Sequence, residues 1–446
     1  MSGVASLPRQ CYRNAISLYW SNRCCRKKSS LINSKLSPQQ APRRYNSISA
    51  ADLQFGQPVH ETHPHILKAG ELTPGITAFE YAHRRAKLAT KLPNNTVAII
   101  RAADVKYRSK SVFYEYHQDS DFFYLTGFNE PGALAIIAKN EFDDDYIFHL
   151  YVREKDPRSE LWQGARSGTQ AALDVFNADE TGDIEQIKDI LPSIVSAASE
   201  IYTDVRGLSS AKSAISRFFP SIQSSTEASN REAATLKIKP LRPLLGELRV
   251  FKSDAEIANM RKAGQAAGRA FTEAMKHNFT SEKDLYAFLE YQIKIKGCDT
   301  SAFVPVVAGG RNALSIHYVR NDDLLSEVNN RKSYGGYSSD ITRTWPVRGK
   351  FNAAQRDLYT AVLDAQRECV KLCCESQYKS LDEIHEHAEH ILSQKLFSLG
   401  FPILRRELKT LFPHHVGHYI GLDVHDTGDY SRRHKLLKGQ CVTIEP

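Results

Sequence analysis

Histidines, carboxylates and glycines gather in one segment, His414-His415-Val416-Gly417-His418-Tyr419-Ile420-Gly421-Leu422-Asp423-Val424-His425-Asp426. Imidazole nitrogens and carboxylate oxygens are common ligands of divalent metal ions. The segment does not follow the His-Glu-x-x-His helix of zinc peptidases, because a second histidine follows His414 and Gly417 interrupts a helix. The pattern favours a strand or loop that presents histidine edges into a cleft. The alternative is a histidine-rich surface loop.

Two more carboxylates stand beside strand-like segments. Asp340 lies in residues 337–345, where apolar and polar residues alternate as in a half-buried strand. Its polar face could hold the carboxylate toward a hard cation, although a solvated strand face is the simpler interpretation of a lone carboxylate. Glu445 follows the apolar run 442–444. Neither carboxylate identifies a site when it is taken alone.

A second histidine-rich segment, residues 385–390, is predicted to form a solvated helix face. It lacks the spacing of a metallopeptidase helix, and Ile384, Ala388 and Ile391 supply a buried stripe at helical intervals. We therefore do not expect a metal there.

The elements that must position these residues fall into two groups. Up to about residue 244, a helix at 77–92 and strand-like runs at 96–100, 133–138 and 146–152 predict an α/β domain. From residue 251 onward, long helices come in pairs, with Ser253/Glu256 and Ser380/Glu383 as capping boxes and a strand expected at 302–308. The repeated order predicts a pseudo-symmetric sandwich with a cleft between its halves.

The formal net charge of +8 belongs to the first 51 residues. They hold nine Lys or Arg and no acid, so 50 basic residues face all 51 acids in residues 52–446, a net of −1. A near-neutral body excludes non-specific nucleic-acid binding, which needs a basic folded surface. The Arg- and Ser-rich, acid-free leader is typical of a mitochondrial presequence, so we expect a mitochondrial protein.

Two further classes are excluded or disfavoured by composition. No apolar run approaches the roughly 18 residues that span a bilayer, so no transmembrane segment is expected. Five cysteines follow the leader, an odd number without a Cys-x-x-Cys pair. That usage favours a reducing compartment over a disulfide framework or a zinc finger.

The motifs named above occur in a familiar order, Ser339-Asp340-Ile341-Thr342-Arg343-Thr344-Trp345-Pro346-Val347, then 414–426, then Thr443-Ile444-Glu445-Pro446, with residues 114–131 and 162–168 in the first half. Together they resemble the Xaa-Pro aminopeptidase (aminopeptidase P) branch of the pita-bread metallopeptidases. With the leader, the resemblance is to the mitochondrial intermediate cleaving peptidases of that branch.

The resemblance implies an α/β (α+β) fold in three parts. Residues 1–51 would be a mitochondrial presequence and flexible leader, and residues 66–245 the aminopeptidase P N-terminal domain. Residues 250–446 would be the pseudo-symmetric pita-bread (creatinase/aminopeptidase-like) catalytic domain, here missing a strand and truncated.

The resemblance also implies a metal-dependent aminopeptidase that acts on peptide or protein N-termini. The family holds two cations, usually Mn²⁺, with two aspartates, one histidine and two glutamates. Asp340 matches the second aspartate, His418 the histidine and Glu445 the first glutamate, which would also act as general base. Three other histidines match catalytic residues that line the substrate site: His317, His414 and His425.

Two ligands of the family's set have no counterpart in this sequence. Counting back eleven residues from Asp340 reaches Asn329, where the family has an aspartate in a Val-Asp-Ala-Gly-like strand. The last glutamate would follow Pro446. We therefore expect at most one weakly held cation and little peptidase activity, since asparagine brings no charge to offset two dications.

Three interpretations fit the sequence. The first is a mitochondrial Xaa-Pro-type aminopeptidase whose sequence is incomplete as written, a splice or gene-model fragment. The second is an inactive pseudoenzyme that binds peptide N-termini, and the third is a prolidase-like dipeptidase, which the N-terminal motifs disfavour. The sequence does not distinguish between Xaa-Pro peptides and the N-termini of imported proteins as substrates. It also leaves open the identity of the metal and whether the chain forms a homo-oligomer.

Overall fold

The computed structural model describes residues 54–140, 145–205, 237–325, 332–334, 337–347, 349–403 and 405–446. The predicted presequence, residues 1–51, and Asn329 lie outside the described residues.

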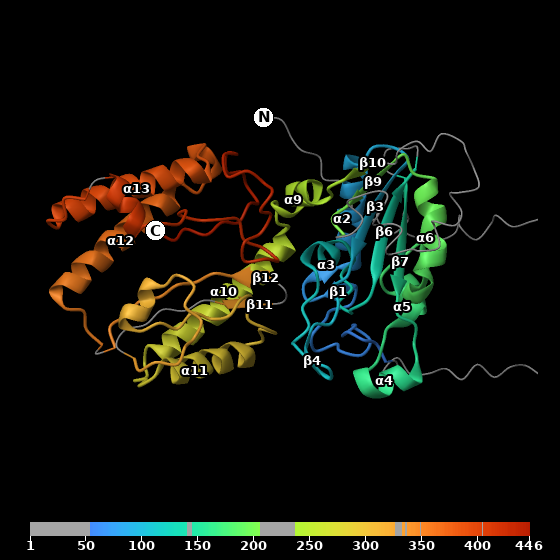
Figure 1. Ribbon diagram of the computed structural model, residues 1–446, viewed down its shortest axis with the longest axis horizontal. Helices are drawn as coiled ribbons and strands as arrows, with labels where there is room; N and C mark the ends of the chain where they lie inside the picture. The colour runs from blue at the N-terminus through green and yellow to red at the C-terminus, as the bar shows by residue number, and fades with distance from the viewer. Residues whose placement is uncertain are drawn as a thin grey trace, which may run out of the picture. The chain divides into compact units, whose positions relative to one another are not determined.

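The first half of the described chain is built on a six-stranded mixed sheet (Figure 1). Its strand order is β10-β9-β3-β6-β7-β8. The pairs β3–β6 and β6–β7 are antiparallel. The remaining pairs, β10–β9, β9–β3 and β7–β8, are parallel. The elements are β1 (Glu71–Thr73), β2 (Ile76–Thr77), α2 (Ala78–Lys91), β3 (Thr96–Arg101), β4 (Tyr107–Ser109), β5 (Val112–Phe113), α3 (Ser120–Thr126), β6 (Leu134–Lys139), β7 (Tyr146–Val152), α4 (Pro157–Gln163), α5 (Gly168–Asp174), β8 (Glu180–Asp183), α6 (Ile187–Ser196), β9 (Glu200–Thr203), β10 (Lys237–Lys239) and α9 (Arg242–Arg249).

The two faces of this sheet bury different helices, because successive side chains of a strand point to opposite faces. Val97 and Ile99 of β3 pack in one cluster with Leu191 of α6. Ala98 and Ile100 pack on the other face with Leu88 of α2. Figure 1 shows α6 running along one side of the sheet. The predicted strands at 96–100, 133–138 and 146–152 are confirmed as β3, β6 and β7.

The second half contains two helix pairs, each with its own apolar core. Its elements are α10 (Asp254–Ala274), α11 (Glu282–Ile295), β11 (Lys332–Tyr334), β12 (Tyr337–Ser339), α12 (Ala353–Leu372), α13 (Leu381–Ser398) and α14 (Arg405–Leu411). Phe271 of α10 packs with Leu289 of α11, and Ala365 of α12 packs with Ile384 of α13. Figure 1 shows the α12–α13 pair in orange and the α10–α11 pair in yellow.

Local hydrogen bonds start these helices where the sequence predicts. Ser253 and Glu256 form a reciprocal capping box at α10, and Ser380 and Glu383 form another at α13. Each box satisfies two backbone N–H groups that the first helical turn leaves without partners. Thr77 caps α2 by accepting from the Glu80 N–H at 3.2 Å.

Two strand predictions in the second half are wrong or too long. Residues 302–308 form no strand, and β12 ends at Ser339 instead of continuing to 345. The backbone N–H groups of a strand normally donate to carbonyl groups of a neighbouring strand. Here the Val307 N–H donates to a side chain instead, to Asn321 Oδ1 at 2.7 Å. Among the described residues after 250, strand pairing is limited to the β11–β12 hairpin and isolated bridges such as Tyr419↔Val442.

No helix in the described parts of the chain is both long enough and apolar enough to cross a membrane.

Candidate metal centre

Three residues expected to bind a metal lie together in the second half. Asp340, His418 and Glu445 each offer one ligand atom, and these atoms all lie within 4.8 Å of one another. His418 Nε2 is 3.4 Å from Asp340 Oδ2 and 3.2 Å from Glu445 Oε1. The structure therefore gathers one imidazole and two carboxylates, a donor set that suits a divalent cation such as Mn²⁺ or Zn²⁺.

Two extended segments bring His418 and Glu445 side by side. The Thr443 N–H donates to the His418 carbonyl at 2.9 Å, and the Glu445 N–H donates to the Val416 carbonyl at 2.6 Å. Gly417 lies against the Thr443 backbone, where an added Cβ would overlap the carbonyl oxygen and sit 2.9 Å from the carbonyl carbon. The glycine is therefore required by the close approach of the two segments.

Asp340 reaches the centre from the end of β12. The Ser338 N–H donates to the Gly421 carbonyl at 2.7 Å, which fixes β12 against the segment that carries His418. The Asp340 side chain is fully buried, whereas those of Glu445 and His418 are 17% and 22% exposed. The centre thus combines one inaccessible carboxylate with two groups that solvent or a ligand can reach.

The orientation of the His418 ring suits metal binding. His418 Nδ1 lies 3.0 Å from the Tyr419 carbonyl, which can only accept, so Nδ1 carries a proton and Nε2 faces the two carboxylates. Burial lowers the pKa of His418, but its close contacts with the carboxylates of Asp340 and Glu445 outweigh burial and raise that pKa to about 9. The protonated His418 ring thus supplies the positive charge between the Asp340 and Glu445 carboxylates that a bound metal ion would otherwise supply.

The other predicted site histidines differ in their relation to this centre. The His425 ring packs edge-on against His418, with 4.3 Å between ring centroids. His414 is exposed, packs on Phe412 and has Nδ1 2.9 Å from the His415 carbonyl, while His317 is exposed. Among the contacts that the described residues make, only that of His425 joins one of these three histidines to the centre. The roles of His317 and His414 stay predictions.

The histidine-rich part of α13 is less solvated than predicted. Ile384 and Ala388 are buried as expected, but Glu389 is buried as well and the His385 ring stacks on His415 at 4.6 Å. His385 Nδ1 also accepts from the Val416 N–H at 3.2 Å. Part of this helix face therefore packs behind the segment that carries His418. The predicted solvated face is only partly correct, because Glu386 and His390 are exposed whereas Glu389 is not.

A buried ion cluster beside the centre was not predicted from the sequence. Arg249 Nη1 lies 2.6 Å from Asp121 Oδ1, and Arg249 Nη2 lies 2.7 Å from Asp423 Oδ2 and also contacts Asp426. Burial alone would raise the pKa of Asp423, but the Arg249 charge and the Ser120 hydroxyl lower it below its usual value. The signal that could have revealed the cluster is a pair of acids, Asp423 and Asp426, flanking His425.

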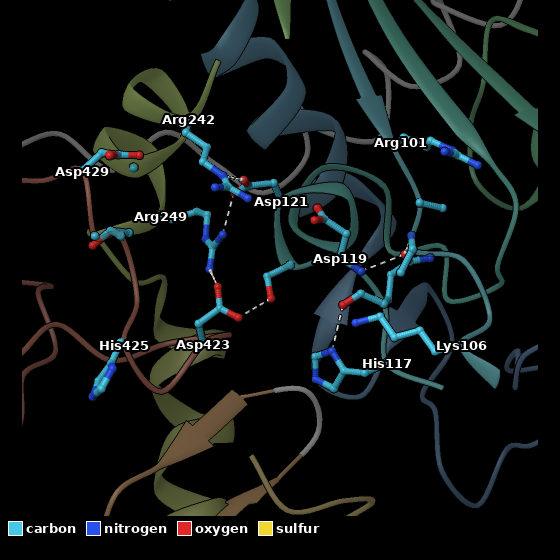
Figure 2. A pocket seen from close by; sticks show the side chains of 17 residues that line it. Arg101, Lys106, His117, Asp119, Asp121, Arg242, Arg249, Asp423, His425 and Asp429 are labelled. Atoms are coloured by element: carbon cyan, nitrogen blue, oxygen red, sulfur yellow. Dashed lines mark hydrogen bonds and ion pairs between the residues drawn. The ribbon is translucent and has the colours of Figure 1, made fainter. Parts of the chain in front are cut away.

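A cavity of about 630 Å³ opens beside this cluster and is lined by residues from both halves of the chain (Figure 2). Its lining is rich in charged and polar groups, including Arg101, Lys106, His117, Asp119 and Asp429. His425 and Asp423 also line it, so the cavity reaches the loop that follows His418.

Two family models match the chain: the aminopeptidase P N-terminal domain over residues 81–202 and metallopeptidase family M24 over residues 258–446. The chain is also 43% identical to "Intermediate cleaving peptidase 55" of Saccharomyces cerevisiae, across 88% of this chain and 79% of that protein. The chain belongs to metallopeptidase family M24. Its M24 region contains Asp340, His418 and Glu445.

Other relatives agree with this membership. Human "Xaa-Pro aminopeptidase 3" is 36% identical across 88% of this chain and 80% of that protein. A crystal structure of Icp55 from Saccharomyces cerevisiae matches with a TM-score of 0.75 and 41% identity, covering 84% of this chain and 87% of that one. Aminopeptidase P from Escherichia coli matches with a TM-score of 0.75 and 29% identity, covering 83% and 86%.

The predicted fold class and enzyme class are confirmed by these matches. The chain pairs an aminopeptidase P-like N-terminal domain with an M24 pita-bread domain, and by family it is a metalloaminopeptidase that relies on a divalent metal. The two matched ranges fall inside the predicted domains 66–245 and 250–446, whose boundaries stay predictions.

Proposed function

We propose that this chain removes the N-terminal residue from peptides or from proteins imported into mitochondria, using a divalent cation held by Asp340, His418 and Glu445. The observation that carries the proposal is the convergence of these three side chains within 4.8 Å of one another. They come from positions up to 105 residues apart, and a chance surface cluster would not include a fully buried aspartate.

The donor set supports one cation better than two. Asp340 and Glu445 supply two negative charges, which balance one dication, and His418 supplies a neutral nitrogen once its proton is displaced. A second dication needs further carboxylates, and Asn329 brings none at the counted position of the family's first aspartate. We propose Mn²⁺ as the ion, at a stoichiometry of one.

The chain's own residues have separable tasks in this reaction. When bound, the cation lowers the pKa of water and polarises the scissile carbonyl. Glu445, 17% exposed, is placed to take a proton from the attacking water and return it to the leaving nitrogen. His425 is exposed beside His418, where its ring can hydrogen-bond to the bound peptide.

A mitochondrial location is part of the proposal. The acid-free basic leader is typical of a presequence, and the relative from Arabidopsis thaliana carries the name "Intermediate cleaving peptidase 55, mitochondrial" at 34% identity. A fusion of residues 1–51 to a fluorescent protein should accumulate in mitochondria, and a cytosolic signal would contradict this part of the proposal.

A second candidate is a binding protein without turnover. The asparagine at position 329 favours it, because an asparagine in place of an aspartate leaves less negative charge to hold a second cation. In this alternative the same centre would bind peptide N-termini without hydrolysing them.

One experiment separates the two candidates. The purified chain is stripped of metal, titrated with Mn²⁺ by calorimetry, and assayed for release of the first residue from peptides that begin Xaa-Pro and from peptides that begin with Tyr, Leu or Phe. Asp340→Asn is the metal-site variant, and Asp322→Asn, at an exposed loop position, is its control. Turnover that needs Mn²⁺ and Asp340 supports the peptidase, whereas saturable peptide binding without any release supports the alternative.

A further inference from the structure

The ion cluster around Arg249 is more extensive than a single salt bridge. Lys252 Nζ lies 2.8 Å from Asp426 Oδ2, and both side chains are only 1% exposed. The Arg249 guanidinium is 7% exposed and contacts three carboxylates, those of Asp121, Asp423 and Asp426. Buried charges of this kind are tolerated only when their geometry is well satisfied, so the cluster resists displacement.

Two members of the cluster, Asp423 and Asp426, belong to the loop of residues 419–426, which follows His418 and contains His425. The Asp426 N–H donates to the Tyr419 carbonyl at 2.9 Å, and the Gly421 N–H donates to the Asp423 carbonyl at 3.0 Å. These bonds close residues 419–426 into a compact loop. His418 lies at its start and His425 near its end, and their rings touch across it.

The loop is packed tightly against the cluster. An added Cβ at Gly421 would lie 2.5 Å from Asp426 Oδ2 and 2.8 Å from Lys252 Cε. His425 lies between Asp423 and Asp426 in sequence, and Arg249 contacts both of these acids. The ion pairs of Arg249 with Asp423 and Asp426 therefore help to fix the position of the His425 backbone.

The same guanidinium connects this loop to the first half of the chain. Arg249 ends α9, and Asp121 and Ser120 belong to α3. Ser120 Oγ donates to Asp423 Oδ1 at 2.6 Å, so α3 contacts the loop directly as well as through Arg249. In Figure 2, a dashed line joins Arg249 to Asp423 below it, and the His425 ring points away from the guanidinium.

We propose that Arg249 is a positioning residue for His425, acting through Asp423 and Asp426 and coupling the loop to α3. The proposal rests on the proposed function for its catalytic meaning, but its structural claim can be measured without turnover. Arg249 does not touch Asp340, His418 or Glu445 among the contacts of the described residues. His418 is held separately by its pairing with Thr443, so the cation's affinity should not depend on Arg249.

The test compares Arg249→Gln and Asp423→Asn with Arg242→Gln. Arg242 is a matched control because it is also an arginine of α9, but its side chain is 62% exposed and lies 3.8 Å from Asp121. Hydrogen exchange of the amides in residues 419–426 is measured together with paramagnetic broadening of the His425 ring signals by Mn²⁺. The His425 signals are assigned with His425→Gln.

We expect both cluster variants to accelerate exchange in 419–426 at least tenfold and to reduce the Mn²⁺ broadening of His425, with the Kd for Mn²⁺ changed less than twofold. With an active chain, kcat should fall about tenfold at a KM changed less than twofold. Arg242→Gln should behave as the unmodified protein. If Arg249→Gln does not fold, Asp423→Asn carries the test, because the Asp423 side chain is 45% exposed and Lys252 still pairs with Asp426.

Exchange and broadening that match the unmodified protein in both variants would overturn the proposal. Exchange that rises equally in α12 and α13 would also overturn it, because that result indicates a general loss of stability. If the unmodified chain binds Mn²⁺ and shows local effects of the variants but releases no residue, the proposed function fails and the positioning role stands.

Discussion

Replacing Gly417 with alanine tests whether the pairing of two segments holds the metal centre. The added Cβ would overlap the Thr443 carbonyl oxygen, so the segment that carries His418 must move away from the one that carries Glu445. The backbone conformation of Gly417 is not the cause, because position 417 is not among the glycines with positive φ. The variant therefore probes distance alone.

The cost can be worked out from the bonds that separation would break. The Thr443 N–H to His418 carbonyl bond and the Glu445 N–H to Val416 carbonyl bond would lengthen together. The net contribution of one hydrogen bond to the free energy of unfolding is about 1 kcal/mol, so losing both bonds would cost about 2 kcal/mol. If the pairing were kept instead, overpacking would cost about 1–3 kcal/mol. We expect local separation, with His418 and Glu445 no longer able to share one cation.

The assay is calorimetric titration of Mn²⁺ into metal-free protein, together with urea unfolding. Gly417→Ala should weaken Mn²⁺ binding at least tenfold and lower the free energy of unfolding by about 1–3 kcal/mol. Gly428→Ala is the control, since an added Cβ there meets no atom within 4 Å. Equal Mn²⁺ affinity in Gly417→Ala and the control would show that this pairing does not hold the centre.

Asp340→Asn should weaken Mn²⁺ binding at least tenfold by calorimetry, because it removes a fully buried charge from the centre, and unchanged affinity would contradict its role as a ligand. The pKa of His418 is raised to about 9, so below that pH the cation must displace a proton from His418. The affinity for Mn²⁺ should therefore fall about tenfold for each pH unit from pH 8 to pH 6, and an affinity that does not change with pH would argue against His418 as a ligand. Hydrogen bonds from Lys435 and from the Ser380 N–H lower the pKa of Glu383 to about 2. Glu383→Gln should therefore lower the free energy of unfolding in urea by about 0.5–1 kcal/mol at pH 7, a modest value because the group is partly exposed. This difference should shrink as the pH falls from the unfolded pKa near 4.3 toward 2, and a pH-independent difference would refute the assignment.

Helix starts were predictable because their causes are local. The capping boxes at Ser253/Glu256 and Ser380/Glu383 join residues three apart, and the sequence contains everything they need. The strands β3, β6 and β7 were predictable for a similar reason, since their apolar runs match a sheet covered on both faces. In contrast, residues 302–308 have β-branched residues but no ladder partner, and Asn321 captures the Val307 N–H instead.

The types of residue available for the centre, and their order along the chain, can be read from the amino-acid sequence. Family resemblance assigned Asp340, His418 and Glu445 to metal binding before their geometry was known. The folded chain is needed to bring one ligand atom of each residue within 4.8 Å of the others and to pack His425 on His418. It also brings Arg249 into contact with three carboxylates from α3 and the loop after His418. The physical reason is range: caps and periodicity act over a few residues, whereas ligand convergence and buried ion pairing depend on segments that meet only in the folded chain.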